Sequence, residues 1–260
     1  MNAQLRAEFL KLRTTRTAAG LASLAVAVTV LMATLESATT GTGRGMAIPS
    51  LATPAGLRDA LASTGFALIA AAVLGTVITA GEFRHKTATG TYLDQPDRTH
   101  LLAAKAVTAA VAGALVGLAA AATAVGIALG FASARGYPLA LPAATIARYG
   151  AGAVLGAGLL AAAGAGAGAL IRHQVGAIIA VFAWGFAVEL VVGGTATAVA
   201  PYLPYTAAAL MAGVTSGGGM PPIPRGITQL PFPAAAAVLA GVVILLAAVA
   251  AATTVRRDIT

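Results

Sequence analysis

Long uninterrupted apolar segments dominate the pattern of hydrophobic and polar positions along this chain. Six of them are long enough to cross the hydrocarbon core of a bilayer, which needs about 20 apolar residues per helix. They cover residues 18–35, 61–80, 106–134, 149–171, 175–200 and 234–255. Each segment is apolar on every face, whereas the strands of a membrane barrel alternate between apolar and polar residues. The pattern therefore predicts an all-α membrane protein with six transmembrane helices in a single domain over residues 1–260.

Composition supports the same class of protein. Apolar residues make up 58% of the chain and charged residues only 9%, whereas charged residues make up about a quarter of an ordinary soluble domain. The chain contains no cysteine, which excludes a disulfide framework, a thiolate metal site and a thiol nucleophile.

The distribution of lysine and arginine predicts the orientation of the chain. If the N-terminus is cytoplasmic, most of the 16 basic residues lie on the inner side, as the positive-inside rule requires. The inner residues are then Arg6, Lys11, Arg13, Arg16, Arg84, Lys86, Arg98, Lys105, Arg172, Arg256 and Arg257, and the outer ones are Arg44, Arg58, Arg135, Arg148 and Arg225. We expect both termini in the cytoplasm. The net charge of +8 then indicates anionic membrane lipid, and no nucleic acid, as the partner of these side chains.

The residues before the first span predict an interfacial helix over 3–14. Leu5, Phe9 and Leu12 share one face of such a helix, and basic residues occupy the rest of its surface. This pattern is typical of a helix that lies in the plane of the membrane surface. A basic tail that only sets the topology is the alternative.

The third apolar segment is unusually long. Its 29 residues would form about 43 Å of helix, against about 30 Å of hydrocarbon, so the helix must tilt, break or emerge from the bilayer. Four G-x-x-x-G spacings occur in the third and fourth segments, a pattern that lets helix backbones approach closely. They are Gly113 with Gly117, Gly126 with Gly130, Gly152 with Gly156, and Gly164 with Gly168. Packing within the chain and a dimer face are both compatible with them.

A polar island, GEFRHKTATGTYLDQPDRTHLLAAK, separates the second and third segments over residues 81–105. A loop that only sets the topology needs basic residues, but this one also contains Glu82, Asp94 and Asp97. The mixture of charges indicates contact with another molecule in water.

The segment from Pro201 to Pro233 is rich in proline and contains an apolar stretch over 206–214 that is too short to span a bilayer. We expect a re-entrant or interfacial helix on the outer side, between the fifth and sixth spans. A plain extracellular loop is the alternative.

Glu189 is the only carboxylate well inside a predicted span. An ionisable residue at this depth usually faces a cavity or a partner, so Glu189 is expected on a translocation path or at an interface between helices or subunits. His85 and His100 have no further ligand placed to complete a metal site, so no metal is expected. No Ser-His-Asp or paired-carboxylate arrangement indicates an intramembrane hydrolase.

Three stretches together resemble the permease subunits of ABC-2 type transporters, a family of bacterial exporters. They are AEFLKLRTTR at the start, the polar island, and WGFAVELVVG followed by PYLPYTAAAL. In the island the similarity lies in Glu82, Phe83, Arg84, Thr87, Pro96, Arg98, Ala104 and Lys105.

The resemblance implies a cytoplasmic coupling helix between spans two and three that contacts separate ABC ATPase subunits. The residues expected in this contact are Glu82, Phe83, Arg84, His85, Lys86, Thr87, Asp94, Pro96 and Arg98. It also implies a second permease, either a copy of this chain or a related one, and a location in the bacterial cell membrane. The chain has no G-x-x-x-x-G-K-[ST] phosphate loop, so we expect no bound cofactor and no enzyme activity of its own. ATP and Mg²⁺ would bind the partner ATPase.

The expected cargo is a hydrophobic or amphipathic compound such as a drug, a peptide antibiotic or a lipid. A secondary carrier or channel is the first alternative, although such proteins usually carry several intramembrane polar groups or an internal repeat. A membrane scaffold or immunity protein without transport activity is the second.

Overall fold

The computed structural model describes residues 2–39, 50–85, 98–214, 223 and 227–253. All regular elements in this part of the chain are helices, and it contains no strand. Six helical segments there are long and apolar enough to cross a membrane, which confirms the predicted fold class. These segments are Arg16–Thr39, Pro54–Arg84, Thr99–Ala134, Ala143–Ile171, Gln174–Thr195 and Phe232–Thr253.

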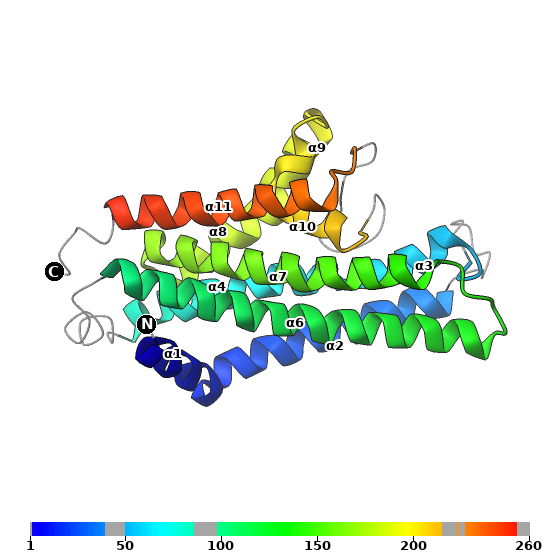
Figure 1. The fold of residues 1–260 in the computed structure, drawn as a ribbon, viewed down its shortest axis with the longest axis horizontal. Helices are drawn as coiled ribbons and strands as arrows, with labels where there is room; N and C mark the ends of the chain where they lie inside the picture. The colour runs from blue at the N-terminus through cyan, green and yellow to red at the C-terminus, as the bar shows by residue number, and fades with distance from the viewer. Residues whose placement is uncertain (1, 40–49, 86–97, 215–222, 224–226, 254–260) are drawn as a thin grey trace.

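The long helices lie side by side along one direction, with the start of α1 and the end of α11 at the same end of the bundle (Figure 1). The elements are α1 (Asn2–Thr14), α2 (Arg16–Thr39), α3 (Pro54–Leu61), η1 (Ala62–Thr64), α4 (Gly65–Arg84), α6 (Arg98–Ala134), α7 (Ala143–Ile171), α8 (Gln174–Ala183), η2 (Trp184–Val188), α9 (Glu189–Thr195), η3 (Ala200–Tyr202), α10 (Pro204–Met211) and α11 (Phe232–Thr253). Helices α4 and α7 form the centre, because most of their residues are buried, whereas few residues of α2 and α11 are buried.

The second span begins earlier than the predicted range of 61–80. The hydroxyl of Thr53 accepts a hydrogen bond of 3.2 Å from the backbone N–H of Gly56, and Pro54 occupies the first turn. A threonine cap followed by proline is a strong start signal for a helix, so α3 forms ahead of the apolar segment and leads through η1 into α4.

Glycines permit the close contact between the central helices. A Cβ atom added at Gly75 would overlap the backbone carbonyl of Ala161 in α7, and one at Gly164 would overlap that of Ala72 in α4. The hydroxyl of Thr76 also donates a hydrogen bond of 3.2 Å to the carbonyl oxygen of Gly164. Helix backbones therefore meet directly here, which small residues make possible inside a membrane.

Three of the four G-x-x-x-G spacings pack within the chain. Added Cβ atoms at Gly113 and Gly117 would come 2.5 Å from carbonyl oxygens of α7. The pairs Gly152 with Gly156 and Gly164 with Gly168 face α10 and α4 respectively. The pair Gly126 with Gly130 has no described atom near it and lies on the exposed side of α6. The spacing that looked equivalent in sequence thus serves internal packing in three cases.

Helix α6 is one unbroken helix of 37 residues. At 1.5 Å per residue it is about 55 Å long, well beyond the hydrocarbon thickness, so it extends out of the bilayer. The residues that extend include the last part of the polar island, from Arg98 to Lys105. The coupling helix predicted between the second and third spans, with Lys86, Thr87, Asp94 and Pro96, lies outside the described residues.

The fifth span is bent. Five residues, Trp184–Val188, form the π-helical turn η2 between α8 and α9, and α9 points away from the other long helices in Figure 1. A π-helical turn inserts an extra residue and is a common cause of a bend. Helix α9 ends at Thr195, five residues before the predicted end at 200, because the backbone of Ala196 leaves the helical conformation.

A short buried helix, α10, connects the fifth and sixth spans, as the apolar stretch over 206–214 predicted. It packs against α7 and α11. At its C-terminus Gly213 adopts a positive φ of 82°, and the N–H groups of Gly213 and Val214 bond to the carbonyls of Leu210 and Ala209. These two bonds form a glycine cap that satisfies the last carbonyls of the helix.

Candidate functional site

Among the described residues, two acidic and two basic side chains form a network of ion pairs at the end of the bundle that contains α1, called the N-terminal end below. The ammonium of Lys105 lies 2.6 Å from Glu82 Oε1 and 3.1 Å from Glu8 Oε2. The ammonium of Lys11 lies 2.8 Å from Glu8 Oε1 and 2.9 Å from Glu82 Oε1. The side chains belong to α1, α4 and α6, so one cluster without net charge joins three helices.

Burial makes this network more than a surface ion pair. The side chains of Lys105 and Glu8 are 4% and 5% exposed, and that of Lys11 is 49% exposed. Surface pairs contribute little to stability, but removing one partner of a buried pair leaves an uncompensated charge and costs several kcal/mol. The network therefore fixes how α1 sits against α4 and α6.

The charges within the network support each other's ionised state. Burial by itself raises the pKa of the Glu8 carboxyl, but the ammonium groups of Lys105 and Lys11 outweigh it, so the pKa lies below the ordinary value. Burial lowers the pKa of Lys11, but hydrogen bonds and the negative charges of Glu8 and Glu82 hold it above the ordinary value. Both groups remain charged at neutral pH.

The expected coupling residues differ in where the structure places them. Glu82 turns inward to the network, whereas Arg84 and His85 are exposed where α4 ends. Phe83 is half-buried under the guanidinium of Arg172, whose Cζ lies 5.6 Å from the ring centroid. Arg98 is the first residue of α6, and the remaining four lie outside the described residues. Their contact with an ATPase stays a prediction.

A mixed cavity of about 510 Å³ opens beside the network. Its polar lining consists of Glu8, Lys11, Thr15, Thr17, Glu82, Arg84, His85 and Gln174. Its apolar lining comes from α4 and from the α1–α2 turn, including Leu12, Leu74, Val77 and Ile78. The N-terminal helix thus forms one wall of a space that has a polar and an apolar end.

Glu189 is 2% exposed and accepts four hydrogen bonds. Its Oε1 accepts 2.9 Å from the indole N–H of Trp184 and 2.8 Å from the backbone N–H of Tyr205. Its Oε2 accepts from the backbone N–H and the hydroxyl of Thr206, at 2.7 and 2.8 Å. The carboxylate therefore caps the N-terminus of α10, where a negative charge is favourable. Of the two expected roles, the geometry favours an interface between helices.

An apolar cavity of about 440 Å³ lies next to this cap. Helices α4, α7, α8, α10 and α11 line it, together with the rings of Trp184, Tyr202 and Tyr205. Glu189 accepts four hydrogen bonds from protein donors, so it has little capacity left to accept one from a ligand in this cavity.

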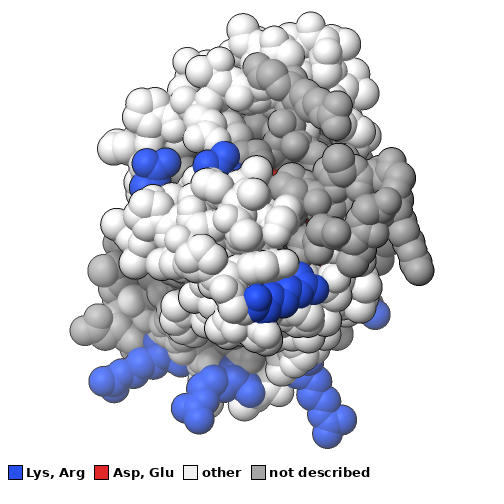
Figure 2. Space-filling view, turned by 90° about the vertical axis from the view of Figure 1, so that its right-hand side faces the viewer, with Lys and Arg blue, Asp and Glu red and all other residues white. Residues whose placement is uncertain are grey.

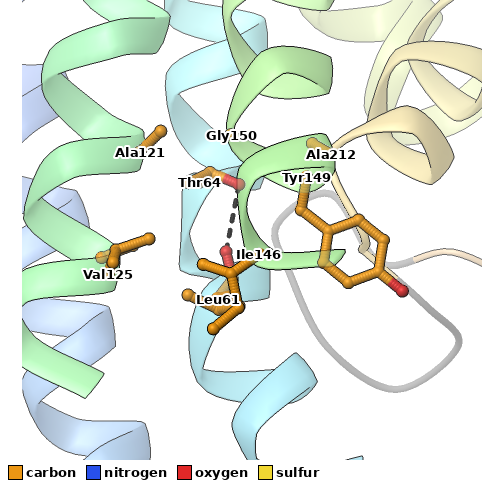
Figure 3. Close-up of a pocket in the computed structure, with 9 residues that line it drawn as sticks. Leu61, Thr64, Ala121, Val125, Ile146, Tyr149, Gly150 and Ala212 are labelled. Carbon is orange, nitrogen blue, oxygen red and sulfur yellow. Dashed lines mark hydrogen bonds between the residues drawn. The ribbon is translucent and has the colours of Figure 1, made fainter. Parts of the chain in front are cut away.

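The space between α3, α6 and α7 is too small to be a site. It measures about 10 Å³, no more than the volume a single water requires. Figure 3 shows the hydroxyl of Thr64 turned back to the carbonyl of Leu61, at 3.2 Å, with Ile146 and Val125 closing the space. The ring of Tyr149 extends away from it, beneath Gly213.

Charge is unevenly distributed between the two ends of the bundle. Figure 2 shows the end near α3, where most of the described surface is uncharged, basic side chains form separate patches and almost no acidic atoms are visible. The described basic residues at this end are Arg58, Arg135 and Arg148. Two of these three side chains have structural partners: Arg135 donates to the carbonyl oxygens of Ser37 and Ala38, and Arg148 lies over Tyr149.

The structural roles of three residues were not predicted from the sequence, although Lys105 is among the residues that carry the family resemblance. Glu8 and Lys105 belong to the network, and His173 caps α8 by accepting a hydrogen bond of 3.0 Å from the N–H of Gly176. The pair of Glu8 and Lys11, three residues apart, is the one signal that sequence offers for the network. Among the described residues, no three His, Asp or Glu side chains gather as a metal site.

Comparison of the chain with protein-family models, curated proteins and solved structures finds no significant match.

Proposed function

We propose that this chain is the permease subunit of an ABC-2 type exporter. It would lie in the bacterial cell membrane with both termini in the cytoplasm and move a hydrophobic or amphipathic compound outward. A separate ATPase would bind ATP and Mg²⁺, and a second permease, either a copy or a related chain, would complete the pathway. The observation that carries the proposal is the ion-pair network at the end of the bundle where α4 ends and α6 begins.

The network is suited to pass movement from an ATPase contact to the membrane helices. The segment between α4 and α6 is the expected contact with the ATPase, and Glu82 and Lys105 lie at its two ends, 2.6 Å apart. The same two side chains are bonded through Lys11 and Glu8 to α1. A push on this segment would therefore move α1, α4 and α6 together, because buried charges resist separation.

The distribution of basic residues supports the orientation. Eight described basic residues lie at the end that contains the network, namely Arg6, Lys11, Arg13, Arg16, Arg84, Arg98, Lys105 and Arg172. The positive-inside rule places that end in the cytoplasm. Helix α10 would then be a re-entrant helix near the outer surface, held in place by Glu189.

The apolar cavity beside α10 supports an apolar cargo. Its lining is almost entirely apolar, with aromatic rings at one side. Such a cavity suits a hydrophobic compound better than an ion or a sugar, because those would lose their hydration without compensating hydrogen bonds. That this compound is an exported cargo follows from the exporter function proposed above.

Co-expression with soluble ABC ATPases from the same organism tests the proposal. We expect one of these ATPases to co-purify with the chain in mild detergent, and ATP hydrolysis by the complex to change when the cargo is added. Charge reversal of the exposed Arg84 should weaken this association, whereas Arg148→Glu, at the opposite end, should not. A chain that never binds the ATPase, yet moves its cargo in a proton gradient, would identify a secondary carrier instead. Neither association nor transport would indicate a scaffold.

A further inference from the structure

The mixed cavity beside the ion-pair network has the shape of an amphiphile. One face of α4 forms its floor, from Leu74 through Val77 and Ile78 to Arg84. Leu74 and Arg84 are ten residues apart, or about 15 Å along the helix, and the lining is apolar at the deep end and polar at the end of the bundle. The turn between α1 and α2 forms one wall, and Gln174 at the start of α8 lies on the other side.

Among the described residues, the four charged side chains of the network and Arg84 together carry one net positive charge. The ammonium groups of Lys11 and Lys105 are bonded to the carboxylates of Glu8 and Glu82. Arg84 also lines the cavity, and among the described residues no carboxylate lies within ion-pair distance of it. A group with a single negative charge would balance the set, and a phosphodiester has this charge.

Gln174 supplies a second, independent sign of a ligand. Its side chain is buried, at 7% exposed, and lines the cavity, yet its Oε1 accepts no hydrogen bond from the described residues. Buried acceptors in proteins almost always have a donor. A ligand with a hydroxyl or ammonium group beside its phosphate would provide one.

We propose that this cavity binds one phospholipid with a glycerol headgroup, taken from the leaflet at the N-terminal end of the chain. Its phosphate lies at Arg84, a headgroup hydroxyl donates to Gln174 Oε1, and an acyl chain lies along Leu74, Val77 and Ile78. The lipid fills the space between the α1–α2 turn and α4, so its presence supports the position of α1. The site requires only that the chain is embedded in a membrane and is independent of the proposed export function.

Native mass spectrometry of the purified protein tests this site, with dioleoylphosphatidylglycerol added in detergent. We expect one lipid to bind ahead of all others, and to bind more tightly than dioleoylphosphatidylcholine, which has the phosphate but no hydrogen-bond donor in its headgroup. Arg84→Gln should weaken this first binding about tenfold by removing a charge-assisted contact. Ile78→Trp, which fills the apolar end, should abolish it. Gln174→Leu should remove the preference for the glycerol headgroup.

Controls separate this site from non-specific lipid contact and from a soluble phosphate site. Arg148→Gln, an exposed arginine at the other end of the bundle, should leave the first binding unchanged. Glycerol 3-phosphate and inorganic phosphate should not displace the lipid, because they lack the acyl chain. Equal binding by wild type and Arg84→Gln would overturn the proposal, as would displacement of the lipid by glycerol 3-phosphate. Arg84 is exposed, so this variant remains decisive even where Ile78→Trp fails to fold.

Discussion

Glu8 and Glu82 at the N-terminal end of the bundle, and Glu189 beside α10, are carboxylates withdrawn from water, but different partners stabilise them. Glu8 and Glu82 are balanced by two ammonium groups. Glu189 is bonded to neutral donors: two backbone N–H groups, a hydroxyl and an indole. The first arrangement joins three helices that are distant in sequence, whereas the second fixes one short helix to the span that precedes it.

The different partners of the ion-pair network and of Glu189 indicate different mechanical roles. Ion pairs between helices depend on charge and on the relative position of the helices, so a force on one helix reaches the others. A capped helix terminus depends on local backbone geometry and resists change. We therefore interpret the network as a connection through which α1, α4 and α6 move together. The Glu189 cap, in contrast, acts as an anchor that holds α10 in place.

The largest effect is expected for Glu189→Leu. The change leaves four donors without their acceptor, three of them buried, and at about 1 kcal/mol each it should destabilise the protein by about 3–4 kcal/mol. The single tryptophan of the chain, Trp184, donates one of these bonds, so its fluorescence reports the change directly. Thermal unfolding in detergent, followed through this signal, measures both effects.

Two controls sharpen this prediction. Glu189→Gln keeps one acceptor oxygen and should cost less, about 1–2 kcal/mol. Leu190→Ala changes the neighbouring residue, which is 40% exposed, and should have little effect on α10. Unchanged unfolding and unchanged fluorescence in Glu189→Leu would contradict the anchor interpretation.

Lys105→Met is expected to have the next largest effect. It removes the most buried ammonium group from the network and leaves the half-exposed Lys11 as the described ammonium beside Glu8 and Glu82, which should cost about 2–3 kcal/mol. Combining it with Glu82→Gln removes one of the orphaned charges, so the double variant should be more stable than the sum of the single effects predicts. A double-mutant cycle measures this coupling, and strictly additive effects would show that the two residues act independently.

Gly213→Ala should destabilise α10 by about 1–2 kcal/mol, because an alanine there is strained at positive φ. Its Cβ would also come 2.6 Å from the ring of Tyr149. Gly126→Ala is the matched control, since no described atom lies within 4 Å of the added Cβ. Helix propensity predicts that this control is neutral or slightly stabilising. Comparing the two melting temperatures tests whether the cap at Gly213 is as specific as the geometry implies.

The smallest effect is expected from pH. The pKa of Glu8 is lowered on folding, so its contribution is complete above the ordinary pKa of 4.5 and is lost as pH falls through the lower folded value. The pKa of Lys11 is raised, so its contribution is complete below 10.5 and is lost only as pH rises through the higher folded value. Protease sensitivity of the connection between α1 and α2 should stay constant from about pH 5 to pH 10. A transition near neutral pH would contradict the assigned partners.

The comparison also shows which features sequence could predict. The number of candidate spans, the N-terminal helix α1 and the short helix α10 follow from segment lengths, charge and proline positions, which are local properties. The depth of Glu189 was likewise visible, but its partners at Tyr205 and Thr206 were not, because the bend at η2 brings them together. The salt bridge between Glu8 and Lys105 joins residues 97 positions apart and depends on α1 packing against α6. Equivalent G-x-x-x-G spacings differ for the same reason, since only the fold decides which face meets a neighbour.

The position of α1 relative to α6 tests the central claim, that the network joins these helices, most directly. The chain has no cysteine, so nitroxide labels can be attached at single cysteines introduced at the exposed positions Arg13 on α1 and Ala103 on α6. Double electron–electron resonance should give one narrow distance distribution in the protein with an intact network and in the Glu189→Gln variant. Lys105→Met should broaden it. An equally narrow distribution in Lys105→Met would contradict the account, because α1 would then be held by contacts other than the ion pairs.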